Sequence, residues 1–197
     1  MRAIEDFDIE GFLDFGISID SEKEIIKNTY IKSYPSMIKF FEEKEKISYD
    51  DFIVGCHMVY GWMPTILKLG FEEIDELLRV LNKAKTSDVL TKEELELIKV
   101  NVNNSIVGGS KLLHFINPNL YPIWDSRVYS NIHIADAYSY RVNNINTYIK
   151  YLDLIKSITK HNKISKFHKN IEKGVGYPIT SVRAVELVLF MLAVNWD

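Results

Sequence analysis

The residues that decide the fold are Val107-Gly108-Gly109-Ser110-Lys111-Leu112-Leu113-His114-Phe115. The apolar residues Ile98 and Val102 end a preceding helix, and the segment from Ser110 onwards has the signals of a helix start. Between them, Gly108-Gly109 predicts a tight turn, because side chains would obstruct it. We therefore expect a helix, a hairpin and a second helix, with Lys111 at the start of the second.

The stretch that follows this motif is Tyr121-Pro122-Ile123-Trp124-Asp125-Ser126-Arg127-Val128. It places an aspartate directly before the next helical segment, 14 positions after Lys111. The predicted hairpin would present backbone N–H groups at a helix amino terminus, where the helix dipole favours a phosphate. The two stretches together combine an amine, a carboxylate and a candidate anion-binding turn.

Apolar residues recur at three- and four-residue steps through the rest of the chain, which predicts helices. Ser48 and Asp51 suit the start of a helix that Pro64 closes or kinks, and residues 91–94 form a capping box. Apolar stripes follow at 71–81 and 148–158, and residues 182–194 are apolar almost all round, which is typical of a core helix. The run 132–134 is compatible with a strand. The prediction is an all-α, compact helical bundle forming a single domain over residues 1–197.

Charge is divided unevenly along the chain. The net charge is -3, but residues 1–100 hold 13 basic and 21 acidic residues, whereas residues 101–197 hold 11 basic and 6 acidic residues. An anion-binding surface is therefore expected in the basic second half. The lysines at 150, 156, 160, 163, 166, 169 and 173 could reach phosphates, but an ordinary solvated helix face is the favoured interpretation.

Composition excludes several classes of site. Cys56 is the single cysteine, so an intrachain disulfide and a cysteine-rich zinc or iron–sulfur site are excluded, and a reducing cytoplasm fits. The five histidines lack a paired-ligand spacing, so we assign no metal and no cofactor. No stretch approaches the roughly 20 apolar residues of a membrane span, and the first residues lack a signal core. The oligomeric state is left open.

Residues 105–130 resemble the helix-hairpin-helix DNA glycosylase superfamily, and compact proteins with the 8-oxoguanine DNA glycosylase fold in particular. In that superfamily a glycine-rich hairpin precedes a catalytic lysine, and an aspartate follows after a short apolar segment. The matching positions are Val107-Gly108-Gly109-Ser110 for the hairpin, Lys111 for the lysine and Asp125 for the aspartate.

The resemblance implies base excision from DNA. Lys111 would attack the sugar carbon as a damaged or modified base departs, giving a Schiff base that can lead to strand cleavage. The amine must be deprotonated to do so, which requires burial or a neighbouring positive charge. Asp125 would stabilise positive charge on the sugar. Gly108, Gly109, Ser110 and Arg127 would contact DNA, and the extruded base would lie in a pocket for which the candidates are Tyr60, Trp62, His114 and Trp124.

Each of these residues also has a structural interpretation. Lys111 could be a solvated lysine in a first helical turn, and Asp125 is a good N-cap for a helix that begins at Ser126. Tyr60 and Trp62 are more often core residues than pocket residues. The alternative function is therefore a non-catalytic all-α module that keeps the hairpin for structure or for binding DNA or a protein.

Two other mechanisms are excluded by spacing. Gly108-Gly109-Ser110-Lys111 lacks the two spaced glycines and the preceding strand of a nucleotide-binding phosphate loop. The chain also has no Gly-x-Ser-x-Gly nucleophile elbow and no cysteine in a nucleophile signature.

Overall fold

The helix that carries Lys111 begins before the glycine pair. In the computed structural model of the chain, which describes residues 1–25, 29–62, 65–86 and 89–192, helix α7 spans Ile106–Ile116. Ser105 caps this helix, because its side chain accepts a hydrogen bond from the Gly108 N–H. The prediction of a turn at Gly108-Gly109 is therefore wrong, and both glycines lie in the first part of α7.

The chain reverses at residues 102–105 instead, between α6 (Lys92–Asn101) and α7. Asn103 and Asn104 adopt the left-handed conformation there, with φ of 62° and 48°, which asparagine tolerates better than most residues. The Asn143 side chain holds the turn, since it donates to the Asn104 carbonyl and accepts from the Ile106 N–H, both at 2.9 Å.

The two glycines of α7 allow close packing, most clearly at position 108. A Cβ at position 108 would lie 2.2 Å from the hydroxyl oxygen of Tyr60, and one at position 109 would lie 3.1 Å from Cγ2 of Ile98. The Tyr60 side chain therefore obstructs any side chain at position 108, so Gly108 is explained by packing and not by a tight turn.

The other elements cover most of the chain, and the sole β contact among the described residues is an isolated bridge between Leu69 and Val102. The strand-compatible run at 132–134 forms the end of a helix and a left-handed residue. The helices are η1 (Ile4–Asp6), α1 (Ile9–Ser18), α2 (Ser21–Ile25), α3 (Thr29–Glu42), α4 (Tyr49–Trp62), α5 (Ile74–Lys85), α8 (Ser126–His133), α9 (Ser139–Val142), α10 (Ile145–Thr159), α11 (Ile164–Val175) and α12 (Ser181–Leu192).

The helix starts predicted at Ser48 and at Thr91 are confirmed, unlike the start expected at Ser110. Thr91 and Glu94 form the reciprocal capping box of α6. Ser48 and Asp51 exchange hydrogen bonds at the start of α4, with the Asp51 N–H donating to the Ser48 hydroxyl and the Asp51 carboxylate accepting from the Ser48 N–H. The expected closure or kink at Pro64 lies outside the described residues.

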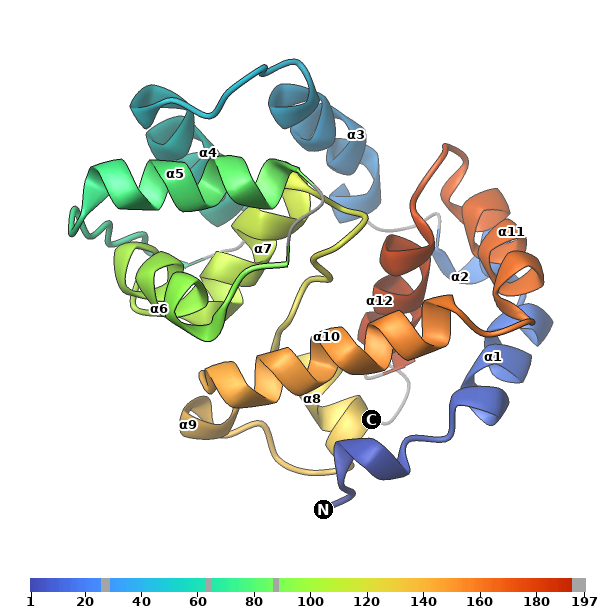
Figure 1. Ribbon diagram of the computed structural model, residues 1–197. Helices are drawn as coiled ribbons and strands as arrows, with labels where there is room; N and C mark the ends of the chain where they lie inside the picture. Colours follow the sequence, from blue (N-terminus) through green and yellow to red (C-terminus); the bar gives the residue numbers. More distant parts are fainter. Residues whose placement is uncertain (26–28, 63–64, 87–88, 193–197) are drawn as a thin grey trace.

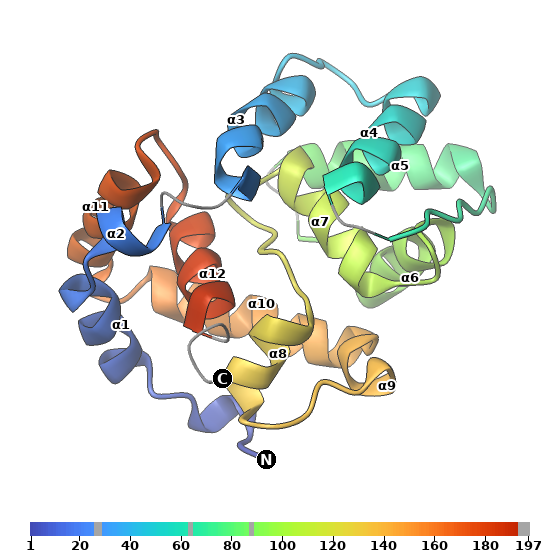
Figure 2. The same cartoon turned by 180° about the vertical axis from the view of Figure 1, so that it is seen from behind.

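The helices lie in two groups (Figures 1 and 2). Helices α3 to α7 form one group, in which α3, α4, α5 and α6 pack around α7. The other group contains α1, α2 and α8 to α12, with the first two helices packed on α11 and with α12 against α8, α10 and α11. The segment from 117 to 125 passes from one group to the other, and α6 contacts α10. The two groups share one continuous core, so the all-α single-domain architecture is confirmed.

Candidate functional site

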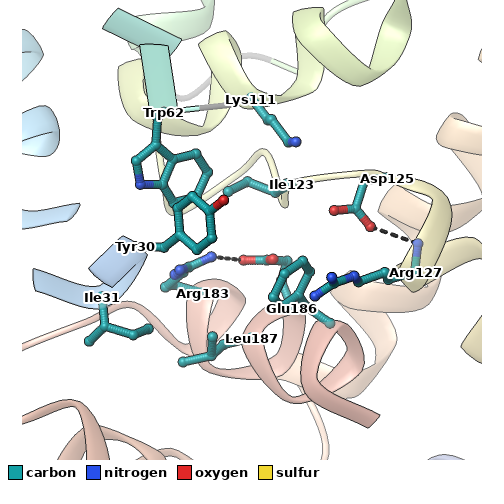
Figure 3. Close-up of a pocket in the computed structure, with 11 residues that line it drawn as sticks. Tyr30, Ile31, Trp62, Lys111, Ile123, Asp125, Arg127, Arg183, Glu186 and Leu187 are labelled. Carbon is teal, nitrogen blue, oxygen red and sulfur yellow. Dashed lines mark hydrogen bonds and ion pairs between the residues drawn. The ribbon is translucent and has the colours of Figure 1, made fainter. Parts of the chain in front are cut away.

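A cavity of about 230 Å³ is lined by residues of both helix groups. This volume is below the range typical of drug-sized ligands, so the cavity suits a small group. Figure 3 shows the residues that form its walls. They come from α3, α4, α7, the 117–125 segment, α8 and α12, and are Tyr30, Ile31, Trp62, Lys111, Ile123, Asp125, Arg127, Arg183, Glu186, Leu187 and Phe190.

Lys111 and Asp125 both line this cavity. Lys111 extends from α7 and Asp125 lies at the end of the connecting segment, and the amine and the carboxylate are directed into the same space (Figure 3). Only 8% of Lys111 is exposed, so the interpretation as a solvated first-turn lysine is wrong. The structure thus brings together the two residues that the sequence singled out.

The environment of Lys111 favours its uncharged form. Burial lowers the pKa of the Lys111 amine, because a charged ammonium loses its hydration there, and Arg127 and Arg183 act in the same direction. Asp125 and Glu186 oppose the shift without cancelling it. A neutral amine is the form that can act as a nucleophile.

Asp125 is also the N-cap of α8. One of its carboxylate oxygens, Oδ1, accepts hydrogen bonds from the N–H groups of Arg127 at 3.0 Å and Val128 at 3.1 Å. Capping therefore holds the carboxylate at the cavity wall. The structural role that the sequence suggested for this residue coexists with its place in the cavity.

Ser110 connects the two segments that supply Lys111 and Asp125. Its hydroxyl oxygen accepts a hydrogen bond from the backbone N–H of Trp124 at 3.0 Å, and the hydroxyl can donate to the carbonyls of Val107 and Trp124. Ser110 is fully buried, as are Gly108 and Gly109. The structure therefore places these three residues away from the surface at which contact with DNA was expected.

Two charged residues of the cavity were missed from the sequence. Arg183 and Glu186 lie one turn apart on α12 and form an ion pair, with only 3% and 1% of the two residues exposed. Residues 182–194 were interpreted as an apolar core helix, and the remainder of α12 largely fits that description. Two opposite charges at i and i+3 in such a helix were the available signal, because buried charges are rare unless they are paired.

Aromatic side chains form much of the remaining wall. The Tyr30 and Trp62 rings meet edge to face with centroids 5.2 Å apart, and Phe190 lies under the guanidinium of Arg127 at 4.7 Å. Trp62 therefore lines the cavity, whereas a core position was the favoured interpretation of its residue type. Arg127 is exposed where it meets the cavity, and this position makes a positive charge accessible to an entering anion.

The other three candidates for the base pocket lie in the core and not in this cavity. Tyr60 packs against Gly108, and the Trp124 indole N–H donates to the Val142 carbonyl at 2.8 Å. His114 is fully buried between the hydroxyl of Tyr34 at 2.8 Å and the Tyr121 carbonyl at 2.7 Å. These residues stabilise the fold around the cavity, and the cavity walls come instead from Tyr30, Ile123, Leu187 and Phe190.

The acidic and basic halves of the chain neutralise each other in part. Lys150 pairs with Glu5, Lys163 with Glu10 and Asp14, and Lys173 with Glu22, at distances between 2.7 and 3.1 Å. The other lysines of this set are exposed, as the solvated-face interpretation predicts, namely Lys156, Lys160, Lys166 and Lys169. The basic second half is therefore not one continuous cationic surface.

Within residues 1–25, 29–62, 65–86 and 89–192, no group of three His, Cys, Asp or Glu side chains is arranged to hold a metal ion. None of the described helices combines the length and apolar character needed to cross a membrane. No protein-family model, curated protein or solved structure matches this chain.

Proposed function

We propose that this protein excises a damaged or modified base from DNA, with Lys111 as the nucleophile. The observation that carries the proposal is that Lys111 and Asp125, 14 positions apart in sequence, line one cavity together. An amine in this setting attacks the sugar carbon and forms a Schiff base, which can lead on to strand cleavage. Asp125 stabilises the positive charge that develops on the sugar.

The size, lining and charge of the cavity suit an extruded base, which is a small group. A base that leaves the helical stack is held between aromatic and apolar side chains, and Tyr30, Trp62 and Phe190 offer such surfaces. Arg127 at the exposed edge is placed to meet a phosphate of the same nucleotide. The partial neutralisation of the lysines by the acidic half favours a local contact with DNA over a long basic track.

The test is borohydride trapping. Duplex oligonucleotides carrying one abasic site, 8-oxoguanine, hypoxanthine, 3-methyladenine or 5-methylcytosine are incubated with the protein and reduced, and covalent adducts are separated by size. We expect an adduct with the abasic site and with at least one base lesion. Lys111→Gln abolishes it, whereas Lys166→Gln, which removes an exposed lysine of α11, leaves it intact.

Two outcomes would contradict the lysine mechanism. One is the absence of an adduct with every oligonucleotide of the panel, including the abasic site. The other is an adduct that forms equally well in Lys111→Gln. Either result, combined with binding of the same oligonucleotides, would favour the non-catalytic DNA-binding module.

A further inference from the structure

Glu186 is a second carboxylate of the cavity, and the proposed base excision by Lys111 and Asp125 assigns it no role. It extends from α12 on the wall that faces Lys111, while Asp125 lies to one side (Figure 3). A carboxylate this deeply buried is costly unless it is paired, and Arg183 is its partner. Buried ion pairs often stabilise a fold no more than apolar side chains of similar size do, so this pair is a candidate for a chemical role.

Arg183 is itself held in place on its other side. Its guanidinium lies over the Tyr34 ring at 4.6 Å, and the Tyr34 hydroxyl is hydrogen-bonded to Nε2 of His114 at 2.8 Å. Because His114 is anchored to the Tyr121 carbonyl, the whole chain of contacts is fixed in the core. Glu186 is therefore held at a defined position in the cavity wall.

Building on the proposed base excision, we propose that Glu186 is the acid that protonates the departing base. Lys111 and Glu186 lie on opposite walls, so a base that enters between them meets the carboxylic acid, and the sugar carbon that carries it meets the amine. Arg183 then stabilises the carboxylate that remains after the proton has left.

The proposed step moves two protons, one from Glu186 to the base and one from the lysine nitrogen to the sugar. The Lys111 nitrogen forms a bond to C1′, and the glycosidic C–N bond breaks with its electron pair going to the base. The base takes the proton of Glu186 and departs as a neutral molecule. A proton then moves from the new ammonium nitrogen to the ring oxygen of the sugar, with Asp125 placed to relay it, and the ring opens to give the protonated Schiff base.

The charges around Glu186 determine when it holds a proton. Facing it are Arg183 from α12, Lys111 from α7, Asp125 and Arg127 from the start of α8, Tyr34 from α3 and Tyr151 from α10. Burial raises the pKa of Glu186 to about 7, against the opposing effect of Arg183 and Lys111. The same burial lowers the pKa of Lys111. Both shifts favour the neutral amine and the protonated acid that the step requires.

The experiment compares two substrates, one of which has no base to protonate. Single-turnover trapping is measured on a base-lesion duplex that the wild type attacks and on the matching abasic-site duplex. Glu186→Gln keeps an oxygen that can accept from Arg183 but cannot act as an acid. We expect this variant to lose about 10²- to 10⁴-fold in rate on the lesion and to change by less than about twofold on the abasic site. Glu93→Gln, at an exposed position of α6, is the matched control.

The outcomes separate this proposal from the previous one. A wild type that traps neither substrate overturns base excision itself, whereas an unchanged lesion rate in Glu186→Gln overturns only the role of Glu186. If Glu186→Gln reacts with neither substrate, the dependence of the wild-type trapping rate on pH decides whether Glu186 acts as the acid. A rate that falls above about pH 7 on the lesion but not on the abasic site supports the acid role. Identical profiles on the two substrates overturn it.

Discussion

The hydroxyl oxygen of Ser110 accepts a hydrogen bond from the backbone N–H of Trp124 at 3.0 Å. Lys111 and Asp125 are the next residues along these two segments, so this one bond aligns them at the cavity. Both partners are fully buried, and water therefore cannot replace the bond if it is lost. The arrangement of the candidate site thus depends on a serine that does not itself line the cavity.

Ser110→Ala tests this alignment. The substitution leaves the Trp124 N–H without an acceptor, and we expect the free energy of unfolding to fall by about 1–3 kcal/mol. Trapping of the abasic-site oligonucleotide should slow as well, because the amine and the carboxylate are less well aligned. Urea unfolding measures the first effect, with Ser165→Ala at an exposed position of α11 as the control. Equal stabilities of Ser110→Ala and wild type would rule out the bond as an alignment device.

The two roles of Asp125 can be separated by two substitutions. Asparagine caps a helix about as well as aspartate, so Asp125→Asn should keep the stability of the wild type while losing the negative charge in the cavity. Asp125→Ala should lose the cap and about 1 kcal/mol of stability. We expect both variants to slow trapping, on the order of 10²-fold, because both lack the carboxylate. If Asp125→Asn trapped DNA at the wild-type rate, Asp125 would act only as a helix cap.

Gly108→Ala tests the close packing of Gly108 against the Tyr60 side chain. The new Cβ would lie 2.2 Å from the Tyr60 hydroxyl oxygen, and we expect a loss of about 1–3 kcal/mol despite the better helix propensity of alanine. In a Tyr60→Phe background the loss should shrink, because the closest atom has been removed. Gly61→Ala is the control, since a Cβ there has no neighbour within 4 Å. Thermal unfolding gives the comparison, and a stabilised Gly108→Ala would show that the close contact is absent.

His114 makes the fold sensitive to acid. Burial lowers the pKa of His114 to about 3, with Arg183 acting in the same direction. The unfolded chain therefore takes up a proton near pH 6.5, while the folded protein does so near pH 3. The contribution of His114 to stability is fully present above pH 6.5 and is lost as the pH falls towards 3, about 5 kcal/mol in total.

The measurement is urea unfolding at several pH values. His114→Gln should be less stable than the wild type at pH 7, because it loses hydrogen bonds to Tyr34 and Tyr121. Its stability should nevertheless fall less between pH 6.5 and pH 4. His57→Gln, at an exposed position of α4, should keep the wild-type slope. If the free energy of unfolding fell equally with pH in His114→Gln and in the wild type, the acid sensitivity would come from other groups.

Most of the secondary structure could be predicted from local sequence patterns. The capping box at Thr91, the Ser48 and Asp51 pair and the apolar stripes are set by residues close in sequence, so they could be predicted. The glycine pair could not be interpreted in the same way. A glycine serves equally in a turn or against a neighbouring ring, and the Tyr60 ring that decides between them comes from a distant segment.

The same division applies to the candidate site. Motif and residue type were enough to pick out four residues that line the cavity, namely Lys111, Asp125, Trp62 and Arg127. They misplaced His114 and Trp124, because an aromatic ring beside a motif can face either the cavity or the core. Arg183 and Glu186 were missed, because the sequence of an apolar helix with one charged pair does not predict which neighbouring element the pair will face. Packing of α12 against α8 and α10 decided that.

The sequence by itself determined an all-helical chain, its principal helix starts and the pair of Lys111 and Asp125, because caps and apolar periodicity act over a few residues. Only the tertiary structure decided that the amine is buried, that the capping carboxylate shares its cavity and that Glu186 closes the opposite wall. Burial, and the pKa shifts that follow from it, depend on which distant side chains exclude water, and that is a property of the packed helices rather than of any local stretch.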